Sequence, residues 1–124
     1  MAHYTDRLRR LAMSDRRSID EVLGCRDGPV EAGLASVDLD ARTVALVHVA
    51  ALVAVDGPNA AFDDAVAVAI AAGATPDDLV DTMIAVGPTI GSARLVSAAP
   101  KLAIALGYDV GAGLEALDAE PDAR

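Results

Sequence analysis

Cysteine and aromatic residues are nearly absent from this chain of 124 residues. Cys25 is the only cysteine, so an internal disulfide is impossible, and we expect a reducing cytoplasmic setting. Tryptophan is missing, and the aromatic residues are Tyr4, Phe62 and Tyr108. Alanine and valine carry the apolar content instead, and 53% of all residues are hydrophobic. Because small side chains bury little area each, one small globule cannot easily hide this surface, which favours a homo-oligomer.

Positive charge is scarce beyond the first quarter of the chain. The net charge is −9, and the only cations after Asp27 are Arg42, Arg94, Lys101 and Arg124. Nucleic acid is therefore not an expected partner, because phosphate binding requires a net basic surface. The first quarter holds six arginines among apolar residues, a pattern more typical of the solvated faces of amphipathic helices than of an RNA-binding arm. These arginines are Arg7, Arg9, Arg10, Arg16, Arg17 and Arg26.

The sequence also lacks a long apolar run. Residues 44–55 form the longest run, interrupted by His48, and it is shorter than the roughly 20 residues of a membrane span. The N-terminus has no apolar core of a signal peptide. We therefore expect no membrane association, and interpret residues 44–55 as part of a buried core helix.

No strand-length alternation of apolar and polar residues is present, so the chain is predicted to be all-α, a bundle of about six helices. Two short helices are expected over residues 5–13 and 14–23, followed by a Gly-rich loop over residues 24–36. Asp38 or Asp40 caps a third helix that runs to about Val55. We expect one domain overall, with N-terminal helices and loop over residues 1–36, a core over 37–110 and an acidic tail over 111–124.

Proline and glycine punctuate the second half of the chain. A fourth helix is predicted over residues 58–72, because proline suits a first helical position, and Gly73 ends it. Thr75 caps a fifth helix that runs to about Val86. Gly87 and Pro88 are expected to kink or interrupt the chain, and Pro100 to open a final helix capped by Ser97. Gly107 closes the helical region, and one turn is expected near residues 114–117.

Three consecutive pieces resemble the carboxymuconolactone decarboxylase family, which includes the alkylhydroperoxidase D-like proteins. Residues 39–43, Leu-Asp-Ala-Arg-Thr before an apolar helix, are similar to the family's LD-x-[KR]-T helix start. Residues 71–79, Ala-Ala-Gly-Ala-Thr-Pro-Asp-Asp-Leu, resemble its xxGAT-x-EE-[LI] turn. Ile90-Gly91 falls where the family carries a glycine in the next helix. The resemblance covers about residues 37–106 and implies an alkylhydroperoxidase D-like helical fold that assembles into trimers or hexamers.

The family's catalytic pattern does not carry over to this chain. The peroxidase branch has Cys-x-x-Cys and then His four residues later, and the matching positions here are Pro58, Ala61 and Ala65. Reduction of a peroxide requires a thiolate and a group that resolves its sulfenic acid, so peroxidase activity is not expected. The decarboxylase branch places an acid and a histidine where Ala61 and Ala65 stand, and alanine cannot move protons. The resemblance thus implies a member with a degenerate active site.

Three polar residues remain as candidate catalytic residues: His48, Asp63 and Arg94. His48 interrupts an apolar run, where a core residue with a hydrogen-bond acceptor is the alternative to an acid–base group. Asp63 or its neighbour Asp64 is a candidate replacement for the lost polar groups, and solvated acids near a helix start are the alternative. Arg94 is predicted to pair with Asp63 or Asp64, or with a bound organic acid. No metal-ligand spacing is present, and we expect neither a metal nor a cofactor.

Two functions follow from these residues. The first is a cofactor-independent protein that binds or converts a small carboxylic acid or lactone, held by Arg94 with His48 or Asp63 as the acid–base group. The second is a non-catalytic oligomeric helical protein with a structural or interaction role, which binds a small apolar molecule or a partner protein. A pocket in which His48, Asp63 and Arg94 converge favours the first, and a dry helix interface favours the second.

Overall fold

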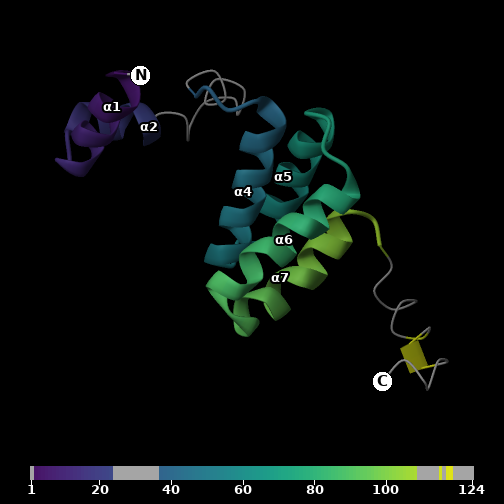
Figure 1. The fold of residues 1–124 in the computed structure, drawn as a ribbon. Coiled ribbons are helices and arrows are strands. Elements are labelled where there is room, and N and C mark those ends of the chain that lie inside the picture. The colour runs from purple at the N-terminus through teal and green to yellow at the C-terminus, as the bar shows by residue number, and fades with distance from the viewer. Residues whose placement is uncertain (1, 24–36, 109–114, 116, 119–124) are drawn as a thin grey trace. The chain divides into compact units, whose positions relative to one another are not determined.

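The computed structural model describes residues 2–23, 37–108, 115, 117 and 118, and their regular structure is entirely helical (Figure 1). The all-α prediction is therefore confirmed. The chain divides into two compact units, Met1–Leu39 and Asp40–Arg124. The predicted loop over residues 24–36, with Cys25, lies outside the described residues. Of the turn predicted near residues 114–117, residues 114 and 116 also lie outside them, and residues 115 and 117 are helical.

The second unit is a bundle of four helices (Figure 1). Helix α4 spans Ala41–Val55, α5 spans Asn59–Ala71, α6 spans Pro76–Ile90 and α7 spans Ser92–Ala105. Helix α4 packs against α5 and α6, and α7 packs against α5, α6 and α4. Every helix of the bundle therefore contacts at least two others, which is what a single shared core requires.

The helix starts follow the capping residues. The Asp40 carboxylate accepts a hydrogen bond from the Thr43 amide at 2.8 Å, so Asp40 rather than Asp38 caps α4. Thr75 and Asp78 form a reciprocal capping box at the start of α6, each side chain accepting from the other residue's backbone amide. Pro58 is the N-cap of α5, so this helix begins at Asn59, one residue later than predicted.

The two internal prolines lie inside helices, which differs from the sequence prediction. Helix α6 continues through Pro88 to Ile90, and α7 begins at Ser92 and continues through Pro100, so neither proline interrupts or opens a helix. Both prolines are exposed, so water can solvate the carbonyls that each leaves without an amide donor. The break between the helices falls instead at Gly91, whose φ of 85° favours glycine.

The core lies between the four helices and is apolar. Its largest fully buried side chains are Phe62, Leu79, Leu102, Val49 and Val53. None of the polar or charged side chains among the described residues is buried. The core is thus filled by aliphatic side chains around a single phenylalanine, as the shortage of aromatic residues requires.

The first unit contains α1, Ala2–Ala12, and α2, Arg16–Leu23. Asp15 opens α2 by accepting hydrogen bonds from the amide and the hydroxyl of Ser18, at 3.1 and 2.7 Å. These contacts, with Ser18 as the donor, hold the pKa of Asp15 below its usual range. Helix α2 has no buried residue. Arg9, Arg10 and Arg17 form ion pairs with acids of their own helices, and their side chains are exposed. This exposure agrees with the predicted solvated helix faces.

Candidate functional site

The three positions that the resemblance matches to the family's thiols and imidazole lie at the start of α5. Pro58 caps this helix without a side-chain hydrogen bond, and Ala61 and Ala65 are half-buried in it. Ala65 packs against the hydrophobic core. These three positions therefore present only apolar surface, so neither thiol nor proton-transfer chemistry can start from them.

His48 lies on α4 and is exposed, contrary to a buried core histidine. Its neighbour Val49 is fully buried, and Ala45 and Val53 lie on the same inward face, one turn before and after Val49. Consecutive helical residues point about 100° apart, which turns His48 away from that face. Within the described part of the chain its side chain has no hydrogen bond or ion pair, so nothing there fixes an acid–base geometry.

Asp63 lies on α5 and is also exposed, as is Asp64. The preceding residue, Phe62, points into the core and is fully buried. The carboxylates therefore lie on the solvated side of α5, within its first two turns. Among the described residues, Asp63 contacts neither His48 nor Arg94 through a hydrogen bond or ion pair.

Arg94 lies in the first turn of α7, and half of its side chain is exposed (50%). Its Nη1 lies 3.7 Å from Oδ2 of Asp56, so its ionic partner is Asp56 rather than Asp63 or Asp64. This distance exceeds that of a hydrogen bond. The guanidinium is thus electrostatically attracted to Asp56 but keeps donors for another acceptor.

Asp56 is the centre of a polar cluster that sequence analysis missed. The residue ends α4 in a left-handed conformation (φ 57°), and its Oδ1 accepts from Ser97 Oγ at 2.6 Å and Lys101 Nζ at 2.9 Å. Lys101 also donates to the Gly57 carbonyl at 3.0 Å. These bonds, from Ser97 first and Lys101 second, lower the pKa of Asp56. The four-residue spacing of Ser97 and Lys101 is the signal that could have indicated a shared partner.

A second polar cluster joins the starts of α4 and α6. Arg42 Nη2 lies 2.7 Å from Oδ2 of Asp78, the same carboxylate that closes the capping box with Thr75. The Thr75 amide and then Arg42 lower the pKa of Asp78 to about 2. Both residues belong to the motifs on which the family resemblance depends, and their role here is to cap and connect two helices.

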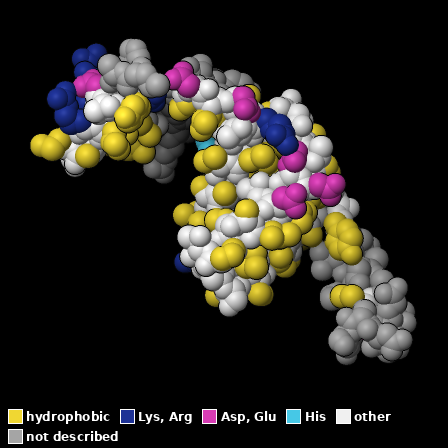
Figure 2. Space-filling view, in the orientation of Figure 1, with side chains coloured by type: hydrophobic (Ala, Val, Ile, Leu, Met, Phe, Trp, Pro, Cys, Tyr) yellow, Lys and Arg dark blue, Asp and Glu magenta, His cyan; other side chains and the backbone are white. Residues whose placement is uncertain are grey.

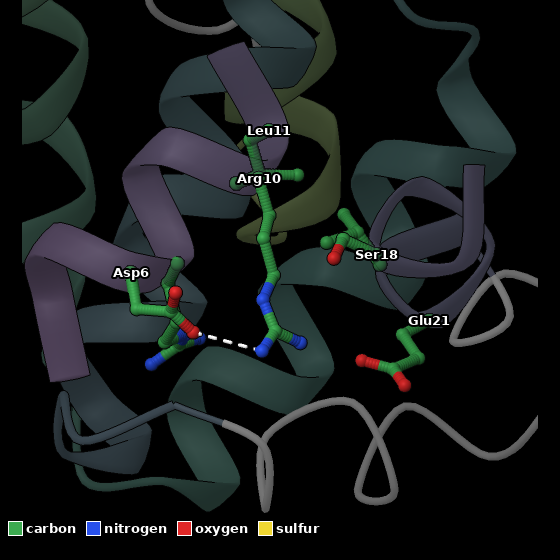
Figure 3. A pocket seen from close by; sticks show the side chains of 7 residues that line it. Asp6, Arg10, Leu11, Ser18 and Glu21 are labelled. Carbon is green, nitrogen blue, oxygen red and sulfur yellow. Dashed lines mark ion pairs between the residues drawn. The ribbon is translucent and has the colours of Figure 1, made fainter. Parts of the chain in front are cut away.

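A third polar site is a hollow between α1 and α2 (Figure 3). It has a volume of about 350 Å³, with Asp6, Arg10 and Leu11 from α1 and Ser18 and Glu21 from α2 in its wall. Asp6 binds Arg10 at 3.0 Å and Arg9 at 2.8 Å. Since these pairs are exposed and lie within one helix, they contribute little stability.

The structure does not bring the three candidate residues together within a single chain. His48, Asp63 and Arg94 lie on three different helices, each side chain is exposed, and none is bonded to another among the described residues. In the described part of the chain, no group of three or more His, Cys, Asp or Glu side chains could hold a metal ion. None of the helices described combines the length and apolarity needed to cross a bilayer.

The comparisons with known proteins agree with this architecture. The family model described as "Carboxymuconolactone decarboxylase family" matches residues 30–103, well over half of the chain. The matched region includes α4, α5, α6 and most of α7, together with the three turns that connect them. No curated protein and no solved structure shows significant similarity to the chain. The chain therefore belongs to the carboxymuconolactone decarboxylase family.

Proposed function

We propose that this chain is a self-associating, non-catalytic helical member of the carboxymuconolactone decarboxylase family with a structural or interaction role. The observation that carries the proposal is the position of the candidate residues: His48, Asp63 and Arg94 are all exposed in the single chain. Acid–base residues of enzymes are usually partly desolvated in a concave site. The alanines at the family's catalytic positions support the same conclusion.

Self-association is supported by the surface of the four-helix unit. Hydrophobic side chains are widespread on the face seen in Figure 2. The large hydrophobic residues of this unit that are more than half exposed include Val47, Val55, Ile84, Val96 and Ile104. A monomer rarely leaves so much apolar surface in water. Size-exclusion chromatography with light scattering is expected to give a trimer or hexamer, and a monomer at micromolar concentration would contradict the proposal.

The absence of catalysis is tested by a turnover screen. Purified protein is incubated with a panel of lactones, small carboxylic acids and hydroperoxides, the last with a thiol reductant. We expect no turnover above that of a sample with heat-inactivated protein. Steady turnover that His48→Ala or Asp63→Ala abolishes, with the helical circular dichroism unchanged, would refute the non-catalytic function.

A second function is favoured by Arg94. Asp56 is already bonded to Ser97 and Lys101, and Arg94 lies 3.7 Å from it. The guanidinium of Arg94 can therefore donate hydrogen bonds to a further carboxylate. A small organic acid bound there, with His48 or Asp63 of a neighbouring copy as the acid–base group, would make the protein a cofactor-independent organic-acid or lactone-handling protein.

Calorimetric titration with small carboxylates separates the two functions. For the second function, binding is expected in the wild type and lost in Arg94→Ala. The matched control is Arg42→Ala, because Arg42 is similarly exposed (47% against 50%) but is bonded to Asp78 at 2.7 Å. Equal binding in both variants, or none in the wild type, would exclude a carboxylate site at Arg94.

A further inference from the structure

The outer side of α4 carries an uncharged stripe made of Val47, His48, Ala51 and Val55, called the α4 stripe below. All four residues are exposed, Val47 to 52% and Val55 to 68%. Val47, Ala51 and Val55 follow one another at intervals of four residues, so they share one side of the helix. The opposite side, with Ala45, Val49 and Val53, is buried in the core.

The α4 stripe belongs to a helix that is apolar on every side. From residue 44 to residue 55, every side chain except that of His48 is aliphatic. A helix that is hydrophobic all round is normally buried on all sides. The other described helices of the second unit cover only its inner side, so the outer side is suited to a further contact.

The chemistry of the stripe selects its partner. A charged surface placed against it would lose water without gaining a counter-charge, which is unfavourable. An anionic membrane is disfavoured by the net charge of −9. A second copy of the chain presents an equally uncharged stripe of the same length, and two α4 helices that run antiparallel also oppose their dipoles favourably.

We propose that α4 packs antiparallel against α4 of a second copy, about a two-fold axis that passes close to Ala51. This inference rests on the proposed self-association and names the surface that produces it. In a two-fold contact, each residue meets its counterpart on the other side of the axis. Val47 and Val55 lie four residues on either side of Ala51, so Val47 of one copy meets Val55 of the other.

The side chains suit this arrangement. Ala51 is small, which lets the helix axes approach to about 8 Å, the short end of the range for packed helices. The valines on either side then fill the flanks of the contact. His48 lies at one edge of the stripe, so its ring body packs on the apolar surface of the second copy while its nitrogens reach water. His48 is thereby explained as an interface residue rather than as an acid–base group.

The proposed contact also restricts the assembly. A two-fold axis is present in a dimer and in a hexamer built from two trimers, but a trimer with only a three-fold axis has none. Of the two assemblies that the family resemblance implies, the α4 contact is compatible with the hexamer.

Disulfide cross-linking tests the contact directly. The variant combines Cys25→Ser, which removes the only native cysteine, with Ala51→Cys. Because residue 51 meets itself at the axis, oxidation is expected to convert most of this variant to a covalent dimer on a non-reducing gel. The control combines Cys25→Ser with Ala67→Cys, an exposed alanine on α5 that lies one turn after Asp63 and Asp64. We expect the control to stay monomeric on the gel.

A second variant tests the contact in solution. Ala51→Glu places a charge at the axis of each copy, and its exposed position means that the fold of the single chain is retained. The mass by light scattering is expected to fall by about half as the two-fold contact is lost. An unchanged mass, as expected if a small apolar molecule or another protein covers the stripe, would overturn the α4 pairing.

These results separate the inference from the proposed function. An oligomeric wild type without cross-linking through residue 51 overturns the α4 contact but leaves self-association in place. A monomeric wild type overturns both. His48→Leu provides a further readout, because a packing role predicts that the oligomer persists or becomes tighter, and dissociation of this variant would contradict that role.

Discussion

Replacing Pro100 by alanine is expected to stabilise the protein. Pro100 lies in the interior of α7, where its ring removes the hydrogen bond from residue 100 to the Val96 carbonyl. Proline in a helix interior is about 3 kcal/mol less favourable than alanine. Two effects reduce this gain: Val96 is 71% exposed, so water already solvates its carbonyl, and proline restricts the unfolded chain by about 0.4–1 kcal/mol.

We therefore expect Pro100→Ala to raise the free energy of unfolding by about 1–2 kcal/mol. Each kcal/mol corresponds to a rise of about 4–8 °C in Tm for a domain of 60–100 residues. The assay is urea denaturation followed by circular dichroism, at one fixed protein concentration because association shifts the apparent stability.

The matched control is Pro76→Ala. Pro76 is the first residue of α6, where a missing amide proton carries no cost, so its replacement is expected to lower the stability by about 0.4–1 kcal/mol. The two variants should therefore change stability in opposite directions. A loss of stability in Pro100→Ala would refute the reasoning, because it would mean that the packing of Ala98 and Leu102 requires the proline-induced geometry of α7.

Three further predictions concern the cap, the core and the turn between α6 and α7. Asp78→Asn should destabilise the protein at neutral pH, because it weakens the capping box and the contact with Arg42. The pKa of Asp78 is lowered from 3.8 to about 2, so this stabilisation is present above pH 3.8 and is lost as the pH falls towards 2. In urea denaturation at several pH values, the difference in free energy of unfolding between variant and wild type should therefore shrink from pH 3.8 to pH 2. Phe62→Ala should lower the free energy of unfolding by about 3–5 kcal/mol, since this ring is fully buried in the core. A loss below about 1 kcal/mol in a denaturant titration would show that the core collapses around the smaller residue. Gly91→Ala should cost about 1–3 kcal/mol through backbone strain alone, because φ is 85° and an added Cβ has no neighbour within 4 Å; an unchanged Tm would show that the turn adopts another conformation.

The fold was largely predictable because its signals are local. Asp40 and Thr75 satisfy the free amides of a helix start, and that preference depends on a few adjacent residues. Pro88 and Pro100 were misinterpreted because their effect depends on the environment. A proline inside a helix is tolerated where its freed carbonyl faces water, and exposure is a tertiary property that the sequence pattern does not contain.

The candidate site was less predictable. The expectation that Pro58, Ala61 and Ala65 stand at the family's catalytic positions needed only the sequence, since it depends on residue type and spacing and not on geometry. The partner of Arg94 could not be predicted, because sequence alone does not distinguish Asp56 from Asp63 as its acid. Only the packing of the α4–α5 turn against α7 brings Asp56 to Arg94.

The sequence by itself determined the helical class, the main helix starts and the family. These follow from residue type and from spacing along the chain, where capping and backbone preferences act over a few residues. Only the tertiary structure decided which side of each helix faces water. It turned His48 and Asp63 outwards, joined Asp56 to Lys101 across 45 residues of sequence, and left the α4 stripe uncovered, because burial depends on how whole helices pack together.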